Sequence, residues 1–493
     1  MANPQEQTGG TTPSKEEAAR VMAEVGGVRS SADPVPDLHW AGQPAGERRD
    51  ATCSAEVKRN EGRGDGPSGL PTPDKVRKLQ ITLYRKAQSS PGYRFWSLYG
   101  EVQRADVLAA AWRRVKANGG VAGTDGVTIE QIAATAEAEA AFLAGVREEL
   151  QRKTYRPLPV LRALIPKASG GMRKLGIPTV RDRVVQMAMS LVLMPIFEAD
   201  FHPRSFGYRP GRGAHDAVEE IQKALYAGKT EVVDADLAQY FDTIPHRKLM
   251  RQVARRVSDG AILKLIKAWL RAPILEHDEV GGGRKLKTNP CGTPQGGVIS
   301  PLLANVYLHP LDEQVNNDRQ QPRMIRYADD LVILCRPGEG QGMEERLARW
   351  LQSRGLALNE KKTRVVKSRQ SGFEFLGFCF RWQQSKQDKA YVHIEPSPAA
   401  EQALRDEVHA LTQRKTSWRE PAEVVREINL KTRGWGHYFA LAHYRRSFQQ
   451  MNHYVGHRLR QWLWRKHGNP FGKYERWTDR VLRHTYHLHV LPS

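Results

Sequence analysis

The stretch that decides the fold is Met324-Ile325-Arg326-Tyr327-Ala328-Asp329-Asp330-Leu331-Val332-Ile333-Leu334, in which two apolar runs flank a pair of aspartates. Runs rich in Ile, Val and Leu predict two strands, and the aspartates are expected at the hairpin turn between them. Two neighbouring carboxylates repel each other unless a cation lies between them, which favours a divalent metal with oxygen ligands. An ordinary turn would give the same pattern, because Asp favours turns for backbone reasons. The rest of the chain must decide between the two interpretations.

The strong positive charge of the chain indicates an acidic polymer as its partner. The 493 residues carry a formal net charge of +22, and an anionic membrane surface is the competing partner. No apolar run is long enough to span a bilayer, and residues 1–10 lack the apolar core of a signal peptide. The length suggests two or three domains. We therefore expect a soluble protein that binds nucleic acid.

The spacing of the cysteines predicts the cellular compartment. Cys53, Cys291, Cys335 and Cys379 are far apart and form no CxxC pair. Isolated cysteines favour a reducing compartment and disfavour a zinc ribbon or a disulfide framework. The predicted location is the cytoplasm.

The composition changes along the chain. Residues 1–75 contain few large apolar residues, with nine Lys and Arg against twelve Asp and Glu, and are predicted to be a disordered extension. Helical periodicity begins near Asp74. Asn118–Gly126 is a glycine-dense loop that could face a phosphate with its backbone N–H groups, or could be a plain connection. From about Ser397 the pattern is helical to the end.

Two basic segments precede the aspartate pair. Val160–Lys167 and Met172–Ile177 predict a β-hairpin, on whose arms Lys167 and Arg173 could grip phosphates. Ser205–Arg212 is a basic, aromatic loop, and we expect its Arg209 and Arg212 to contact RNA.

A third aspartate lies in an apolar strand. Glu231–Leu237 reads as a buried strand that contains Asp236, and a buried Asp costs free energy unless it is paired or bound to metal. Asp236 and Asp329 supply carboxylates from separate segments, as a pair of divalent ions roughly 3.5–4 Å apart requires. Lys167 and Arg173 could neutralise the charge that develops on a triphosphate. Phosphoryl transfer asks for little else from a protein than such positioning and charge.

Nine ordered stretches resemble a group II intron reverse transcriptase/maturase of the bacterial type. They span roughly residues 75 to 480 and are Asn118–Gly126, Pro166–Arg183 (PKASGGMRKLGIPTVRDR), Ser205–Arg212 (SFGYRPGR), Val233–His246 (VDADLAQYFDTIPH), Gly292–Leu308 (GTPQGGVISPLLANVYL), Arg326–Asp330 (RYADD), Leu356–Thr363, Phe375–Phe378 and Arg433–Tyr438 (RGWGHY). The resemblance implies an α+β fold of the right-hand polymerase type, with fingers and palm built on antiparallel sheet and an α-helical thumb, or X, domain.

The resemblance also implies a division of the chain. Residues 1–75 would be the extension, 76–150 a helical segment of the fingers and 151–382 the fingers and palm. Residues 383–480 would be the thumb and 481–493 a short basic tail. Relatives often end in an HNH endonuclease with cysteine pairs, which this sequence lacks, so we do not expect it to cut the second target strand itself.

Roles follow for individual residues. The resemblance implies catalytic roles for Asp236, Asp329 and Asp330. It implies that two Mg²⁺ ions are held by Asp236, the Leu237 carbonyl and Asp329. Residues expected to bind the dNTP are Lys167, Arg173, Phe241, Gln295, Gly296 and Lys362, among which Phe241 would exclude a ribose 2′-hydroxyl. Arg433 and Trp435, in the thumb, are expected to bind RNA. Without the motifs, simple core packing would be the preferred interpretation of Phe241 and Gln295.

The expected function is RNA-directed DNA synthesis on intron RNA, combined with assistance to splicing and copying during retrohoming. The implied partners are group II intron RNA, a DNA target with its primer strand, and dNTPs, with a homodimer possible and no membrane. One alternative is an RNA-binding splicing cofactor with a vestigial polymerase. Another is a related reverse transcriptase recruited to defence or diversification.

Overall fold

A computed structural model of the chain describes residues 72–166, 172–277, 283–317, 322–441, 443–468 and 473–492. The predicted disordered extension lies almost entirely outside the described residues, and so do Lys167 and the hairpin turn that follows it. Within the described residues, no helix is long and apolar enough to cross a membrane.

The centre of the molecule is a four-stranded antiparallel sheet, the palm sheet, with strand order β6-β7-β3-β8. Its strands are β3 (Glu231–Asp236), β6 (Arg323–Tyr327), β7 (Asp330–Cys335) and β8 (Arg364–Lys367). The predicted hairpin is confirmed, because β6 and β7 pair directly and Tyr327 lies opposite Asp330. Only Ala328 and Asp329 form the loop between them, so Asp330 opens a strand rather than sitting in the turn.

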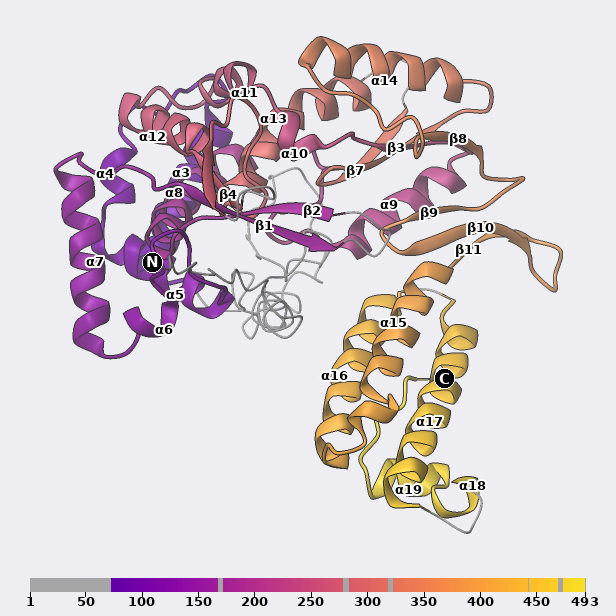
Figure 1. Ribbon diagram of the computed structural model, residues 1–493. Coiled ribbons are helices and arrows are strands. Elements are labelled where there is room, and N and C mark those ends of the chain that lie inside the picture. The colour runs from indigo at the N-terminus through magenta and orange to yellow at the C-terminus, as the bar shows by residue number, and fades with distance from the viewer. Residues whose placement is uncertain are drawn as a thin grey trace, which may run out of the picture.

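Both faces of the palm sheet are buried, which explains why its central strand β7 is apolar at every position after Asp330. Val233, Leu331 and Ile333 face one core, to which helices α8 (Val180–Glu198) and α13 (Ser300–Asn316) contribute. Val232, Val332 and Leu334 face a second core, shared with helix α9 (Ala214–Tyr226) and the C-terminal helices. The sheet therefore joins two parts of the molecule (Figure 1).

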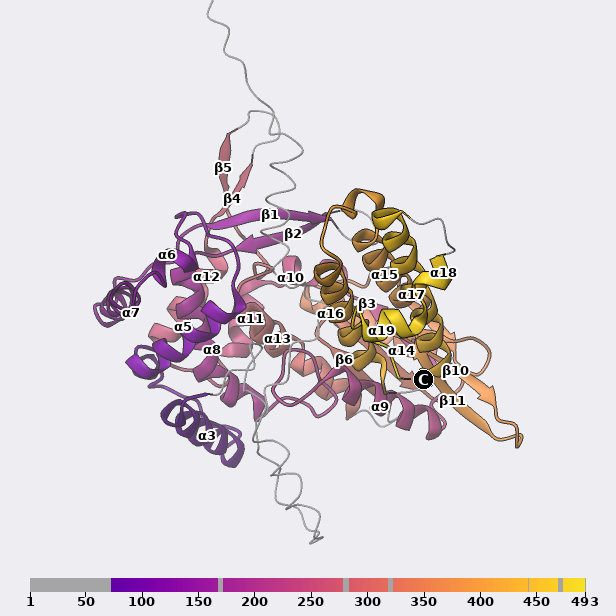
Figure 2. The same cartoon turned by 90° about the horizontal axis from the view of Figure 1, so that it is seen from below.

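The fingers are a second sheet covered by helices. Their sheet has the order β2-β1-β4-β5, in which β1 and β2 are antiparallel while β1 and β4 are parallel. Its strands are β1 (Val160–Pro166), β2 (Met172–Ile177), β4 (Ile274–His277) and β5 (Arg284–Lys287). The helices around it include α3 (Asp74–Ser89), α4 (Tyr99–Val102), α5 (Ala105–Asn118), α6 (Ile129–Ile132), α7 (Ala136–Gln151), α11 (His246–Val253) and α12 (Gly260–Arg271). The β1–β2 hairpin runs from these helices toward the thumb, and β4–β5 projects from the body (Figure 2).

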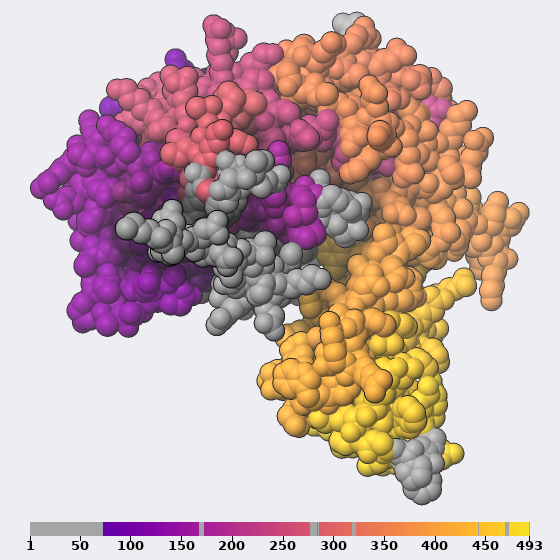
Figure 3. Space-filling view, in the orientation of Figure 1, coloured from indigo at the N-terminus to yellow at the C-terminus, as the bar shows by residue number. Residues whose placement is uncertain are grey.

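The thumb is a helical bundle attached through a small sheet. Strands β9 (Phe373–Phe375), β10 (Phe378–Gln384) and β11 (Ala390–Pro396) form that sheet, so the expected boundary at residue 383 falls inside β10. The helices that follow are α15 (Pro398–Leu411), α16 (Pro421–Phe439), α17 (Arg445–His467), α18 (Lys473–Arg476) and α19 (Asp479–His484), with a 3₁₀ turn at Arg414–Thr416. A recess separates the thumb from the fingers (Figure 3).

The end of the chain is fastened to the thumb by two asparagines. Asn429 donates to the carbonyl of His487 and accepts from the N–H of His489, at 2.8 and 2.7 Å. Asn452 makes the same reciprocal pair with the carbonyl and N–H of Leu491, at 3.0 and 2.9 Å. These bonds satisfy backbone groups that would otherwise need water, so the described tail is part of the bundle.

Candidate active site

Two aspartates face each other at one end of the palm sheet. Asp236 is the last residue of β3, and its partner across the sheet is Asp330, the first residue of β7. Side chains directly opposite on antiparallel strands have Cβ atoms roughly 4.5–5.5 Å apart and point to the same face. Asp329 lies one residue earlier, in the hairpin loop. The fold thus gathers the three carboxylates that the sequence places almost a hundred residues apart.

Burial and neighbouring carboxylates raise the pKa values of Asp329 and Asp330. Burial and then the charge of Asp236 raise the pKa of Asp329, while Arg173 and Arg326 oppose that shift. Burial, Asp329 and Asp236 together raise the pKa of Asp330 to about 7, although part of its side chain remains accessible to solvent. Crowded carboxylates of this kind are relieved when a cation binds between them.

The backbone after Asp236 adds a carbonyl oxygen. Ala238 donates to Ala357 and Asn359 donates to Asp236, at 2.9 and 2.8 Å, on either side of the bridge between Leu237 and Leu358. In an antiparallel pair, residues between two such bonds turn their own N–H and C=O to the opposite side. The Leu237 carbonyl therefore points away from Leu358, toward the side on which β7 and Asp329 lie.

A basic and an amide side chain flank Asp236. Lys362 Nζ lies 3.5 Å from Asp236 Oδ2, and the lysine side chain is 63% exposed. Asn359 Nδ2 donates to the same oxygen at 2.8 Å. Asp234, two residues earlier, is engaged instead by Arg364 Nε at 3.1 Å. Asp236 is therefore held in one orientation, with one carboxylate oxygen in use.

These donors suit Mg²⁺ better than a metal that needs a protein cage. Within the described residues, no three His, Cys, Asp or Glu side chains converge on one point as a complete ligand set. Mg²⁺ is commonly held by one or two carboxylates together with waters and substrate phosphates. Asp236, the Leu237 carbonyl and Asp329 would hold it here, because all are oxygen donors at the same end of the sheet.

The loop that carries Asp329 is strained and externally supported. Ala328 has a φ of 60°, a conformation that costs a residue with a Cβ about 1–2 kcal/mol. Its carbonyl accepts a hydrogen bond of 2.8 Å from Arg326 Nη1. The same guanidinium pairs with Asp312 at 2.5 Å and donates to Asn305 and Ser205, both at 2.7 Å. Because Arg326 is completely buried, this network fixes the loop from inside the protein.

Gly207 of the Ser205–Arg212 segment touches the aspartate loop directly. A Cβ at Gly207 would lie 2.9 Å from the Tyr327 carbonyl carbon and closer still to Ala328 N. Asn305 also donates to the Gly207 carbonyl at 2.8 Å. This motif is thus a support for the loop.

We expect Gly207→Ala to lower the rate of the DNA synthesis that the resemblance implies by about 100-fold, because a displacement of roughly 1 Å at a reacting group has that effect. Steady-state primer extension measures it. The control is Gly145→Ala in α7, where an added Cβ meets nothing within 4 Å. Equal activity of both variants would mean that the loop tolerates the displacement.

The Gly292–Gly297 loop joins the palm to the fingers. Thr293 N donates to the Phe241 carbonyl at 2.7 Å, and the Gln295 carbonyl accepts from Gly176 N of β2 at 2.5 Å. Gly296 has a φ of 104°, and a Cβ there would lie 2.5 Å from the Gly176 carbonyl oxygen. The predicted nucleotide residues Phe241, Gln295 and Gly296 are therefore parts of one connected unit.

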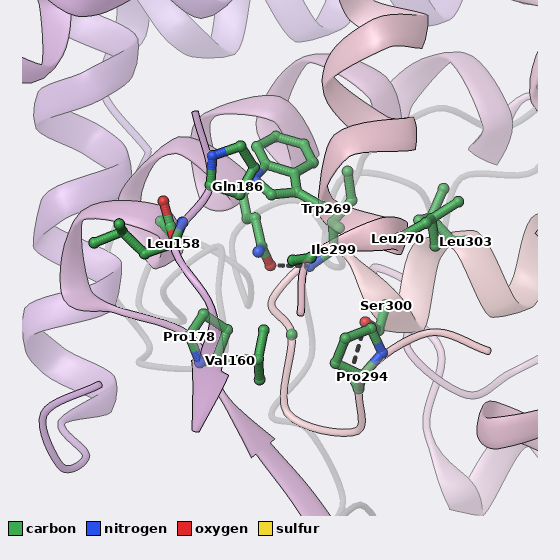
Figure 4. A pocket seen from close by; sticks show the side chains of 14 residues that line it. Leu158, Val160, Pro178, Gln186, Trp269, Leu270, Pro294, Ile299, Ser300 and Leu303 are labelled. Carbon is green, nitrogen blue, oxygen red and sulfur yellow. Dashed lines mark hydrogen bonds between the residues drawn. The ribbon is translucent and has the colours of Figure 1, made fainter. Parts of the chain in front are cut away.

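A small cavity lies behind this loop, between α8, α12 and α13 (Figure 4). Its volume is about 20 Å³, which is room for roughly one water molecule. Gln186 Oε1 accepts from Ile299 N at 3.4 Å and Ser300 Oγ donates to the Pro294 carbonyl at 2.9 Å. None of the three aspartates lines this cavity, so it is not part of the site that they form.

The predicted RNA contacts are divided between the interior and the surface. Arg209 is buried, pairs with Glu198 at 2.6 Å and donates to the carbonyls of His202 and Ser205. The expected RNA contact at Arg209 is therefore wrong, and its role is structural. Arg212 is half-buried and donates to the Pro203 carbonyl at 2.6 Å.

The Arg433–Tyr438 segment is divided between the interior and the surface, with Arg433, Gly434 and His437 exposed. Trp435 is half-buried, donates to the Ala400 carbonyl at 3.3 Å and packs on Phe439. Tyr438 donates to the Leu376 carbonyl at 2.9 Å, and burial, with Tyr327 and Asp330, raises its pKa. Arg433 alone of the predicted thumb contacts is exposed.

Sequence reasoning missed the residues that hold the site together. Asn305, Asp312, Arg326 and Asn359 were not singled out, although three of them lie inside quoted motifs. Two of them could have been found from the sequence of α13, because Asn305 and Asp312 are polar residues on its buried, mostly apolar side. Buried polar groups need partners.

Two protein families match the chain. The family described as "Reverse transcriptase (RNA-dependent DNA polymerase)" matches residues 165–380, and "Group II intron, maturase-specific domain" matches residues 401–486. The chain belongs to the group II intron reverse transcriptase/maturase family. It is thus a reverse transcriptase with a right-hand polymerase fold, of a family that uses divalent metal ions and binds intron RNA.

Curated relatives share different portions of this reverse transcriptase/maturase. Protein YkfC of Escherichia coli is 34% identical over 342 residues, which are 61% of this chain and 87% of the relative. Group II intron-encoded protein LtrA of Lactococcus lactis is 35% identical over 237 residues, 47% of this chain and 38% of the relative. The putative COX1/OXI3 intron 1 protein of Saccharomyces cerevisiae is 27% identical over 335 residues, which are 57% of this chain and 39% of the relative. The chain thus spans less than half of two of these three relatives.

Proposed function

We propose that this reverse transcriptase copies its intron RNA into DNA at Asp236, Asp329 and Asp330, with two Mg²⁺ ions held by Asp236, the Leu237 carbonyl and Asp329. The observation that supports this most is the direct pairing of Asp236 with Asp330 across β3 and β7, with Asp329 beside them. When bound, the ions would activate the attacking hydroxyl and stabilise the leaving phosphate.

The chain's own residues position the substrates. The primer 3′-hydroxyl attacks the α-phosphorus of the dNTP, the bond to the β-phosphate breaks, and pyrophosphate leaves. Lys362, whose Nζ lies 3.5 Å from Asp236 Oδ2 and whose side chain is mostly exposed, would give a proton to the pyrophosphate. Arg173, whose charge acts on Asp329, would neutralise the triphosphate. The same role for Lys167 remains a prediction.

Phe241 would lie beneath the incoming sugar. It follows Asp236 by five residues, its side chain is 4% exposed, and its ring packs edge-on against Tyr240 at 5.4 Å. A ring fixed in this way cannot yield to a 2′-hydroxyl, so it would exclude ribonucleotides by steric overlap.

We expect Phe241→Ala to lower the preference for dNTP over rNTP by about tenfold or more, a change of about 1.4 kcal/mol. The ratio of kcat/KM for dATP and ATP on one primer–template measures this preference. Phe241→Tyr keeps the ring and is the control. An unchanged ratio in the alanine variant would place the sugar discrimination elsewhere.

The maturase domain supports a second part of the proposal, in which the protein binds its intron, promotes splicing and then copies the RNA during retrohoming from a DNA primer strand. The exposed side chain of Arg433 on α16 is a candidate contact. The test is to incubate the full chain with its precursor RNA and a target DNA duplex. We expect spliced exons and cDNA primed from the target. If cDNA forms but splicing is not accelerated, the splicing part of the proposal is contradicted and only the polymerase activity is supported.

A further inference from the structure

An exposed tryptophan is held rigidly on the back of the fingers. Trp96 is 70% exposed, yet its neighbours Phe95 and Leu98 are buried. Phe95 donates to the Arg256 carbonyl and accepts from Ser258 N, both at 2.7 Å. Asp259 accepts from the N–H of Leu98 at 2.8 Å. The indole is thus fixed outside the protein by a well-anchored backbone.

Exposed arginines lie on the segment that carries this indole and on the segment that anchors it. Arg94 and Trp96 lie on the same side of an extended segment, because alternate residues share a face. Arg94 Nε donates to the Ala254 carbonyl at 2.9 Å, which places it beside the end of α11. Arg247, Arg251 and Arg255 are exposed and follow one another at steps of four. We call Arg94, Trp96, Arg247, Arg251 and Arg255 the Trp96 patch.

The patch keeps its positive charge. Two acidic residues that border it are turned inward: Asp200 pairs with Arg256 at 3.1 Å, and Asp259 caps α12 through Ala261 N at 2.9 Å. Among the described residues, Arg247 and Arg251 form no ion pair with an acidic side chain. Residues four apart on a helix lie about 6 Å from each other, so Arg247 and Arg251 form a short ridge on α11, and Arg255 follows two residues past the end of that helix. Such a row of cations can follow a phosphate backbone.

The patch lies away from the polymerase recess. Helices α11 and α12 are on the opposite side of the body from the thumb helices (Figure 1). A primer–template in the recess therefore leaves the patch open.

We propose that the Trp96 patch is a second RNA-binding surface, at which the arginines contact phosphates and the indole stacks on an unpaired base. Guanidinium groups suit phosphates, and an aromatic face accepts any base. The surface fits a folded RNA strand with an unpaired base. It goes beyond the proposed catalysis, because it requires none of the three aspartates.

The test measures binding of an RNA hairpin with an unpaired loop to protein whose recess is already filled with primer–template. For Trp96→Ala we expect affinity to fall about 5- to 150-fold, the range for loss of one stacked base, and Trp96→Phe should restore most of it. For Arg251→Gln/Arg255→Gln we expect the salt dependence of binding to lose about two units of slope. Primer extension should be unchanged in all three.

The matched control removes the same charge elsewhere on the fingers. Arg147→Gln/Arg152→Gln, two exposed arginines at the C-terminal end of α7, should keep the salt slope within about one unit of wild type. An equal loss in both double variants, or no loss with Trp96→Ala, would overturn the proposal. So would a patch variant that binds the hairpin normally but loses binding to anionic phospholipid vesicles. Loss of primer extension in a patch variant would contradict the separation of the patch from the polymerase site, whereas the proposed catalysis is tested at the three aspartates.

Discussion

Replacing Asp329 and Asp330 together with alanine is expected to abolish cDNA synthesis, with a fall of about 10³-fold or more in kcat. Losing the carboxylates that face Asp236 removes several kcal/mol of metal-dependent stabilisation, and each 1.36 kcal/mol is a factor of ten. RNA binding should persist, because the change removes negative charge near a polyanion. Primer extension and filter binding on the same preparation measure both.

The control for this variant is an adjacent acidic pair far from the site. Glu344→Ala/Glu345→Ala lies on α14 (Gly340–Arg354) and removes equal charge. It should extend primers at the wild-type rate. Residual synthesis by the aspartate variant above that of a reaction without metal would contradict the assignment of these two residues.

The second large effect is expected at Asp312, which no substrate touches. Asp312 and Arg326 are 1% and 0% exposed and pair at 2.5 Å. Asp312→Asn leaves the guanidinium buried without its counter-charge, which costs about 3–5 kcal/mol. Urea denaturation should show this as a lower midpoint with an unchanged slope.

A double variant separates stability from positioning. Asp312→Leu/Arg326→Met replaces both charges with apolar groups, and such replacements are often neutral or stabilising. It should unfold near the wild-type midpoint but still extend primers poorly, because Ala328 and Ser205 lose their donor. The control is Glu148→Gln, which breaks an exposed ion pair with Arg152. It should lower the free energy of unfolding by less than about 1 kcal/mol. Full activity of the double variant would remove Arg326 from the positioning of the loop.

The sequence predicted the palm hairpin and the adjoining strand because both depend on local pattern. Apolar runs around Asp329 and Asp330 gave β6 and β7, and the run before Asp236 gave β3. The stretch Leu356–Asn359 contributes only a single bridge, between Leu237 and Leu358. A short pairing of this kind depends on the neighbouring strand more than on intrinsic preference.

The burial of Arg209 and Arg326 was the main feature that could not be predicted from the sequence. Arg209 was expected to bind RNA because arginine is mostly exposed, but Glu198, eleven residues earlier, holds it inside. Arg326 is buried through a partner fourteen residues away, on another element. Such pairs are set by the packing of α8 and α13, and no local pattern records them. The family resemblance supplied the motifs but not their burial.

The most direct measurement of the metal site replaces Mg²⁺ with Fe²⁺ in the complex with primer–template and dNTP, and maps where hydroxyl radicals cut the protein backbone. Radicals form at the bound iron, so cuts are expected near Asp236–Leu237 and near Asp329 together. Excess Mg²⁺ should suppress both sets, and the alanine variant of Asp329 and Asp330 should lack them. Cuts confined to other segments, or cuts that persist unchanged in that variant, would contradict a metal site at this end of the palm sheet.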